Sequence, residues 1–202
     1  MKTKVETVIG FCKHCEKESE FYPYHLSRCK ECRKAYQRDR NHNNPKTKSS
    51  NKNKAHKRRA MKKELPNNMK AAQLRALNER FGNRCFLTGS TDVSIEHPIP
   101  FATGHGGHIV GNVLPMDNSL NISRKDKNFF EWFNTLDATV EMHNRFDEAV
   151  EYLAALNGLS VDLFREYVYY CDKYRRTIEE VKADKRRSVE IFKEWKAAGG
   201  RI

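Results

Sequence analysis

IEHPIPFATGHGGHIVGNVLPMDNSLN, residues 95–121, holds three His, three Asn, one Glu and one Asp. The apolar alternation of residues 93–99, and again of residues 108–116 after the glycines, predicts two short strands joined by a loop. Asp117 and Asn118 offer the N-cap chemistry that begins a short helix carrying Asn121. The stretch is either a polar surface loop or a hydrolytic metal site laid out along the chain.

The residue types in this stretch suit phosphodiester hydrolysis. A neutral histidine can take a proton from water, and a carboxylate with a second oxygen ligand can hold Mg²⁺. Glu96 and His97 are adjacent, and neighbours on a regular strand point to opposite faces. Both reach one site only where the strand end is irregular, and Pro98 and Pro100 are consistent with that.

The order of these residues resembles the HNH (ββα-metal) endonucleases, whose run is an acidic residue and a histidine, a hairpin loop, an asparagine, and an Asn or His on the following helix. The matching elements are Glu96-His97, the segment GHGG at 104–107, Asn112 and Asn121. The resemblance covers about residues 83–135, where CFLTG (85–89) and NFFEWF (128–133) also look like family flanks.

The resemblance implies a role for each matched residue. His97 resembles the general base that activates water, and Glu96 and Asn121 resemble the protein ligands of one Mg²⁺ or Mn²⁺ ion. Asn112 resembles the residue that braces the hairpin and thereby orients His97. Hydrolysis of this kind leaves 5′-phosphate and 3′-hydroxyl ends.

The sequence departs from the family pattern in two ways. The family's acidic residue is more often Asp, and Glu96 is one methylene longer. Many relatives bind a structural zinc around the motif through two CxxC pairs, whereas this region has only Cys85. We therefore expect packing to hold the ββα unit, through the helical face of Phe129, Trp132 and Phe133.

A separate zinc site is expected near the N-terminus. Cys12 and Cys15 form one CxxC pair and Cys29 and Cys32 form another, with 13 residues between the pairs. This is the spacing of a zinc ribbon or knuckle, in which four thiolates complete a closed, structural Zn²⁺ site. A disulfide pair is the alternative, although an intracellular chain would keep these thiols reduced.

The charge distribution predicts a nucleic-acid partner. The chain has a net charge of +12, and residues 1–66 hold 19 Lys/Arg against 7 Asp/Glu, so the remaining residues are neutral in sum. A basic arm on a neutral body is typical of phosphate binding, and the family resemblance implies that the partner is double-stranded DNA. No membrane association is expected, because the arm has no amphipathic apolar face. The expected nucleic-acid contacts are Arg33, Lys34, Arg38, Arg40, Arg58, Arg59, Arg124 and Lys125.

Composition, helical periodicity and what the family resemblance implies together predict an α+β chain in four parts. These are a zinc-binding head (1–40), a flexible basic linker (41–66), an HNH ββα-metal core (67–137) and a helical C-terminal region (138–202). We expect helices at about 69–82 and from Asn128, then one that ends at Asn157-Gly158, and a longer one capped by Ser160 that reaches Val181. The C-terminal helices are candidates for a protein partner, a homodimer or a DNA reader.

The leading hypothesis is a metal-dependent HNH endonuclease that cleaves DNA, similar to enzymes carried by bacteriophages and mobile elements. The alternatives are a non-catalytic zinc-ribbon protein that binds nucleic acid, and a nuclease that processes RNA. The absence of an apolar run long enough for a membrane or a secretory signal predicts a cytoplasmic protein. His105 and His108 are interpreted as polar loop residues.

Overall fold

A computed structural model of the 202-residue chain describes residues 6–43 and 45–202, with the side chains of 41–49 outside the description. It is a mixed α+β structure with two small antiparallel sheets, as the sequence predicts. The chain forms two compact units, residues 1–51 and 52–202. The expected nuclease core and C-terminal helical region thus belong to one unit.

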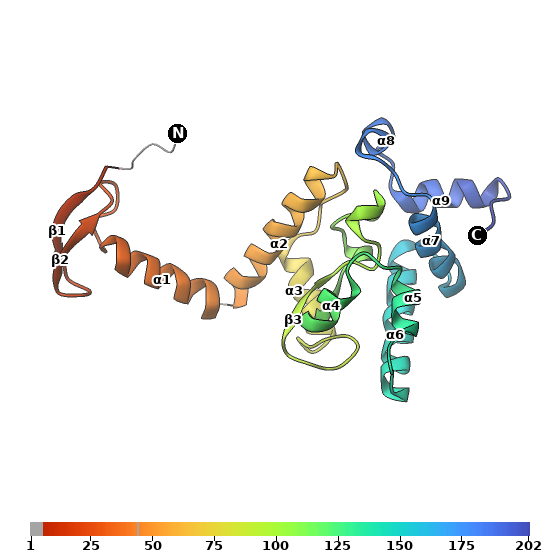
Figure 1. The fold of residues 1–202 in the computed structure, drawn as a ribbon, viewed down its shortest axis with the longest axis horizontal. Coiled ribbons are helices and arrows are strands. Elements are labelled where there is room, and N and C mark those ends of the chain that lie inside the picture. The colour runs from red at the N-terminus through yellow and green to blue at the C-terminus, as the bar shows by residue number, and fades with distance from the viewer. Residues whose placement is uncertain (1–5, 44) are drawn as a thin grey trace. The chain divides into compact units, whose positions relative to one another are not determined.

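The first unit is a hairpin followed by a helix (Figure 1). Strand β1 (Val8–Cys12) pairs with β2 (Lys17–Phe21), and helix α1 (Lys30–Asn43) follows. The buried apolar residues here are two of the cysteines and Phe21. So small a core rarely supports a fold by itself, which favours a metal as the stabilising element.

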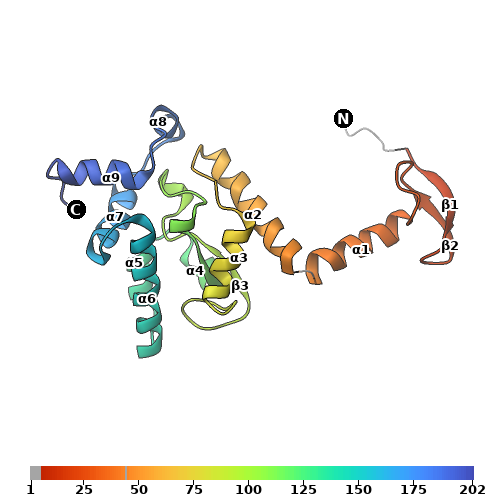
Figure 2. The same ribbon diagram turned by 180° about the vertical axis from the view of Figure 1, so that it is seen from behind.

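The second unit contains residues 95–121, and its two strands lie between α3 (Ala71–Arg80) and α4 in the order of the sequence. Strand β3 (Val93–Glu96) pairs antiparallel with β4 (Leu114–Asp117), and helix α4 (Asn118–Arg124) packs on both strands. The Asp117 side chain accepts hydrogen bonds from Ser119 N and Leu120 N, so the predicted N-cap is confirmed. Figures 1 and 2 show α3 and α4 close to β3 in both views.

This unit contains further helices besides α4. They are the C-terminal part of α2 (Pro45–Lys62), then α3 (Ala71–Arg80), α5 (Phe129–Asn134), α6 (Val140–Asn157), α7 (Val161–Lys173), α8 (Ile178–Ala183) and α9 (Ser188–Ala197). Helix α5 lies beside α6 in Figures 1 and 2, and Phe133 stacks on Phe146 with ring centroids 3.8 Å apart. The expected aromatic face of α5 is confirmed, because Phe129, Trp132 and Phe133 are all buried in the main core.

The prediction of a flexible linker over 41–66 is wrong for the C-terminal part of that segment. Helix α2 continues into the second unit, where Ala60 and Leu65 are buried against Val181 and Phe101. Asn53 is also buried, and its Nδ2 donates to the carbonyl oxygen of Met69. A few small contacts therefore order a segment whose composition alone predicts no buried face.

Three smaller expectations also differ from the structure. Residues 85–89, whose apolar character in the sequence suggests a further short strand, form a turn instead, because the Cys85 thiol accepts hydrogen bonds from Leu87 N and Thr88 N. The strand expected over 108–116 begins only at Leu114, after a 3-10 turn at Val110–Asn112. The long helix after Ser160 divides into α7 and α8, because Thr177 and Glu180 form a new capping box.

Candidate functional site

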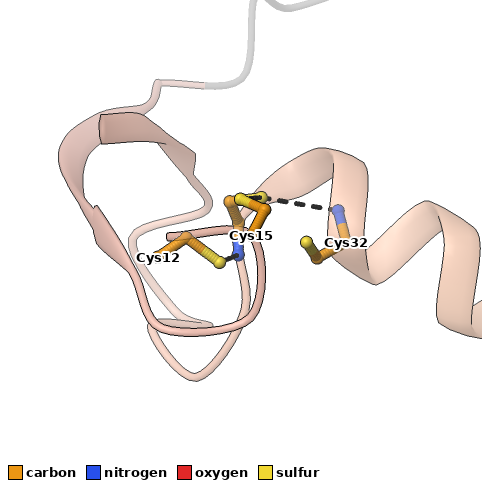
Figure 3. Close-up of side chains that lie close together, drawn as sticks. Cys12, Cys15 and Cys32 are labelled. Atoms are coloured by element: carbon orange, nitrogen blue, oxygen red, sulfur yellow. Dashed lines mark hydrogen bonds between the residues drawn. The ribbon is translucent and has the colours of Figure 1, made fainter. Parts of the chain in front are cut away.

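The four cysteines of the first unit meet at one point. Cys12 ends β1, Cys15 lies in the turn that follows, Cys29 precedes α1 and Cys32 lies in its first turn. Their sulfur atoms all lie within 4.8 Å of one another, and Figure 3 shows how Cys12, Cys15 and Cys32 converge. The Cys15 and Cys29 sulfurs are 3.8 Å apart, the edge expected of a tetrahedron with Zn–S bonds of about 2.3 Å. The predicted cluster could hold a metal such as zinc.

The electrostatics of this cluster also suit a cation. The backbone N–H of Cys29 donates to the Cys12 sulfur and lowers the pKa of Cys12 to about 6. The pKa of Cys32 is raised to about 12, chiefly by its contact with Cys29. Neighbouring thiolates repel one another, so a bound cation is what would keep all four deprotonated.

The basic residues expected to contact nucleic acid in this unit differ in exposure. Lys34, Arg38 and Arg40 are exposed on α1, whereas Arg33 is half-buried with its guanidinium over the Tyr22 ring at 5.4 Å. Lys34 forms an exposed ion pair with Glu31 at 2.8 Å. The three exposed side chains are therefore accessible to a phosphate backbone.

A pocket of about 430 Å³ in the second unit brings together most of the predicted catalytic residues. Its polar inner wall includes Glu96, His97 and Asn121. Exposed cationic side chains at the ends of two helices also line it: Arg59, Lys62 and Lys63 at the end of α2, and Lys125 directly after α4. Of the predicted basic residues, Arg58 is exposed on α2 but does not line this pocket.

His97 lies directly after β3, where the two prolines end the regular strand. Its ring is 9% exposed and packs 4.3 Å from the Phe101 ring, between centroids. Nε2 lies 3.0 Å from Nδ1 of His108, which is the one hydrogen bond of the His97 ring found among the residues described. Burial lowers the pKa of His97 well below its usual value, which favours the neutral ring that a general base requires.

Glu96 forms a buried ion pair with Arg124. Oε1 lies 2.5 Å from Nη1, and both side chains are 2% exposed. The contact is not aligned as a hydrogen bond, so Oε1 remains a buried carboxylate oxygen without a donor among the residues described. Burial raises the pKa of Glu96 to about 7 and lowers that of Arg124, so desolvation outweighs their attraction in both groups.

The expectation that Arg124 is an open phosphate contact is therefore wrong. Its guanidinium donates from Nη2 to the carbonyl oxygen of Pro98 at 2.7 Å and lies over the Phe129 ring. These contacts use Arg124 to hold the end of β3 against α4 and α5. Lys125, the next residue, is exposed at the mouth of the pocket.

The two predicted asparagines occupy different positions. Asn112 joins both arms of the hairpin: its Oδ1 accepts from Ile99 N, and its Nδ2 donates to the carbonyl oxygens of Ile99 and Gly107. Asn121 donates from Nδ2 to Ser94 Oγ and to the Ile95 carbonyl oxygen. This fixes the amide of Asn121 and leaves its Oδ1 as the available acceptor beside the pocket.

His105 and His108 lie in the loop between the two strands, as predicted, but both are 0% exposed. His105 bonds through Nε2 to the Tyr174 carbonyl oxygen at 2.7 Å. The loop is covered so closely that a Cβ on Gly104 would lie 2.1 Å from the carbonyl oxygen of Arg176. Glycine at this position is thus a packing requirement, and the segment between α7 and α8 forms the cover.

Sequence reasoning missed several residues that the fold brings to this site. His56, on α2, lies with its ring 5.1 Å from that of His97 and 5.5 Å from that of His108. Asn53 bonds to His108, and Lys62, Lys63 and Asp126 line the pocket. The only signal in the sequence is the spacing of Asn53, His56 and Arg59 on one helical face.

Comparison of the chain with family models, with curated proteins and with solved structures found no match. Among the residues that the structure describes, no helix combines the length and the apolar character needed to cross a bilayer. Two groups of side chains in this chain have the chemistry of a functional site: the four cysteines of the first unit and the pocket of the second.

Proposed function

We propose that the protein is a metal-dependent endonuclease of the HNH type that hydrolyses phosphodiester bonds of double-stranded DNA. One observation supports the proposal above all. His97, whose ring hydrogen-bonds through Nε2 and, among the described residues, not through Nδ1, lines a pocket with cationic side chains at its mouth, together with Glu96 and Asn121. A general base, oxygen ligands and positive charge for phosphates are the three components that the reaction needs.

The donor set also fits a divalent cation. Glu96 offers a buried carboxylate oxygen that lacks a hydrogen-bond donor, and Asn121 offers an amide oxygen whose partner nitrogen is already held. Carboxylate and amide oxygens are the ligands that Mg²⁺ and Mn²⁺ prefer. Bound there, the ion would supply positive charge for the phosphate and the leaving oxygen, and Glu96 would exchange its contact with Arg124 for the metal.

In the proposed reaction the chain's own residues bind the backbone and move one proton. Arg59, Lys62 and Lys63 hold phosphates at the rim. Nδ1 of His97 takes a proton from water, whose oxygen attacks phosphorus while the bond from phosphorus to the 3′ oxygen breaks. The 3′ oxygen leaves as a hydroxyl after it takes a proton from solvent, and the phosphate stays on the 5′ end.

The first experiment is cleavage of supercoiled plasmid by the purified chain with Mg²⁺, with Mn²⁺ and with EDTA. Nicked or linear DNA with 5′-phosphate ends is expected with either metal and no product with EDTA. Structured RNA in parallel reactions tests the substrate class, and faster cleavage of RNA would replace DNA in the proposal. The absence of any cleavage, under all metals, would contradict the proposal.

The second candidate function is that of a non-catalytic nucleic-acid-binding protein held by zinc. The observation that favours it is the engagement of Glu96 by Arg124, which occupies one proposed metal ligand. This function predicts DNA binding that weakens with salt and no cleavage with any divalent metal. The plasmid assay separates the two functions directly.

A further inference from the structure

A chain of hydrogen bonds runs from helix α2 to the proposed general base. Asn53 Oδ1 lies 2.7 Å from Nε2 of His108, and Nδ1 of His108 lies 3.0 Å from Nε2 of His97. We propose that His108 and Asn53 are positioning residues that hold the proton of His97 on Nε2 and thereby leave Nδ1 as the basic atom. The catalytic role of these residues rests on the proposed function, whereas the assignment of the proton to Nε2 is independent of it.

The amide of Asn53 sets the direction of the whole chain of bonds. Its Nδ2 lies 3.1 Å from the carbonyl oxygen of Met69, which can only accept a hydrogen bond. The nitrogen of the amide must therefore face Met69, and the oxygen must face His108. Asn53 is 5% exposed, so water does not compete for either contact.

The proton positions then follow one after another. Because Asn53 Oδ1 is an acceptor only, Nε2 of His108 must carry a hydrogen. In a neutral His108 ring, Nδ1 is then an acceptor, so the 3.0 Å contact requires a hydrogen on Nε2 of His97. Nδ1 of a neutral His97 is left with its lone pair.

His108 is suited to remain neutral in this position. It is 0% exposed, and no carboxylate hydrogen-bonds to it among the residues described. Burial lowers the pKa of His108 to about 4, and the positive charge of Lys57 acts in the same direction. The ring of His56 covers it from one side at 5.5 Å, which excludes water without adding a negative charge.

Helix α2, which the sequence presents only as part of a basic linker, would therefore contribute to the proposed catalysis. Asn53 lies on α2, and the same helix supplies Arg59 and Lys62 to the pocket rim. In hydrolases that use a histidine base, a residue that fixes the tautomer is worth much of the rate, and a wrong tautomer costs on the order of 10⁴-fold. We therefore expect a large loss of rate when the acceptor at His108 Nδ1 is removed.

The proton assignment can be measured without any activity. Long-range ¹H–¹⁵N spectra of the full, zinc-loaded chain labelled with ¹⁵N-histidine, without added Mg²⁺ or Mn²⁺, report which ring nitrogen carries the proton. The signals of His97 and His108 are assigned by their loss in His97→Ala and His108→Asn. The Nε2–H form is expected for both rings at pH 7.5, and an Nδ1–H form of His97 would overturn the proposal.

A matched pair of substitutions tests the catalytic consequence. The Oδ1 atom of Asn stands where His has Nδ1, whereas the amide of Gln reaches the position of Nε2. His108→Asn should therefore keep an acceptor for His97 and retain cleavage within about 10-fold, whereas His108→Gln and His108→Leu should lose at least about 100-fold. Circular dichroism and the melting temperature show whether each variant folds.

The two failures are distinguishable. If the wild-type chain cleaves DNA and all three His108 variants cleave equally well, the positioning role is wrong while the proposed function stands. If the wild-type chain does not cleave, the proposed function is wrong, and the spectra still decide the proton assignment. A variant that does not fold leaves the wild-type spectra as the deciding measurement.

Discussion

Replacement of Arg124 by Met should destabilise the second unit strongly, because it leaves the Glu96 carboxylate buried without a cation. Nη1 and Oε1 are 2.5 Å apart, both side chains are 2% exposed, and Nη2 also donates to Pro98. Removing one partner of a buried pair costs about 3–5 kcal/mol. At about 2–4 °C per kcal/mol for a unit of this size, the melting temperature should fall by roughly 6–20 °C.

The same pair carries a pH signature. The pKa of Glu96 in the folded chain is raised to about 7, above its ordinary value of 4.5, so the fold favours the protonated carboxyl. Its contribution to stability is therefore greatest below about pH 4.5 and is lost as the pH rises toward 7. The cost of Arg124→Met should accordingly be smaller at pH 5 than at pH 8, because the carboxyl left alone is then neutral more often.

Urea denaturation at both pH values measures these free energies. Arg175→Met is the matched control, because its ion pair with Asp172 has a similar length but is exposed, and such pairs contribute about 0–1 kcal/mol. The double variant Glu96→Gln/Arg124→Met should recover part of the loss. A loss below about 1 kcal/mol for Arg124→Met, equal at both pH values, would refute this account of the pair.

Three further predictions concern the metal, the glycine loop and acid stability. Metal analysis should find one zinc per chain, and Cys15→Ser should reduce that content; a chain that binds none would contradict the four-sulfur cluster. Gly104→Ala should cost about 3 kcal/mol or more in urea denaturation because its Cβ meets the Arg176 carbonyl, whereas Gly82→Ala, which also has a positive φ but open space, should cost about 1–2 kcal/mol. Burial lowers the pKa of His105 to about 4, so stability should fall between pH 6.5 and 4 by up to about 3 kcal/mol for this group; His105→Gln should flatten that dependence, and an unchanged slope would count against it.

The sequence predicts the local elements around the site well, because their signals are local. Asp117 and Asn128 cap α4 and α5 through hydrogen bonds to residues two and three positions ahead. The two CxxC pairs are likewise local signals, because each pair bends the backbone so that its two sulfur atoms face a common centre. Chemistry of this kind can be recognised within a window of a few residues.

The contacts that complete the site have no local signal. Asn53 and His108 are separated by 55 residues, and His105 and Tyr174 by 69, so nothing in either segment shows its partner. In the sequence Arg124 looks like a surface cation, because it is followed by the charged residues Lys125 and Asp126, which are indeed exposed. Its burial depends on Glu96 and Pro98, which reach it only after β3 and α4 pack together.

We propose that His97 is the base of a phosphodiester hydrolysis. The most direct test of this proposal is the initial rate of plasmid cleavage with Mg²⁺ by His97→Ala, compared with the wild-type chain and with His143→Ala, an exposed histidine on α6 that lies outside the pocket. We expect His97→Ala to lose at least about 100-fold, since general-base catalysis contributes roughly 10²–10⁴-fold, and His143→Ala to cleave at the wild-type rate. Cleavage by folded His97→Ala at the wild-type rate would contradict the claim.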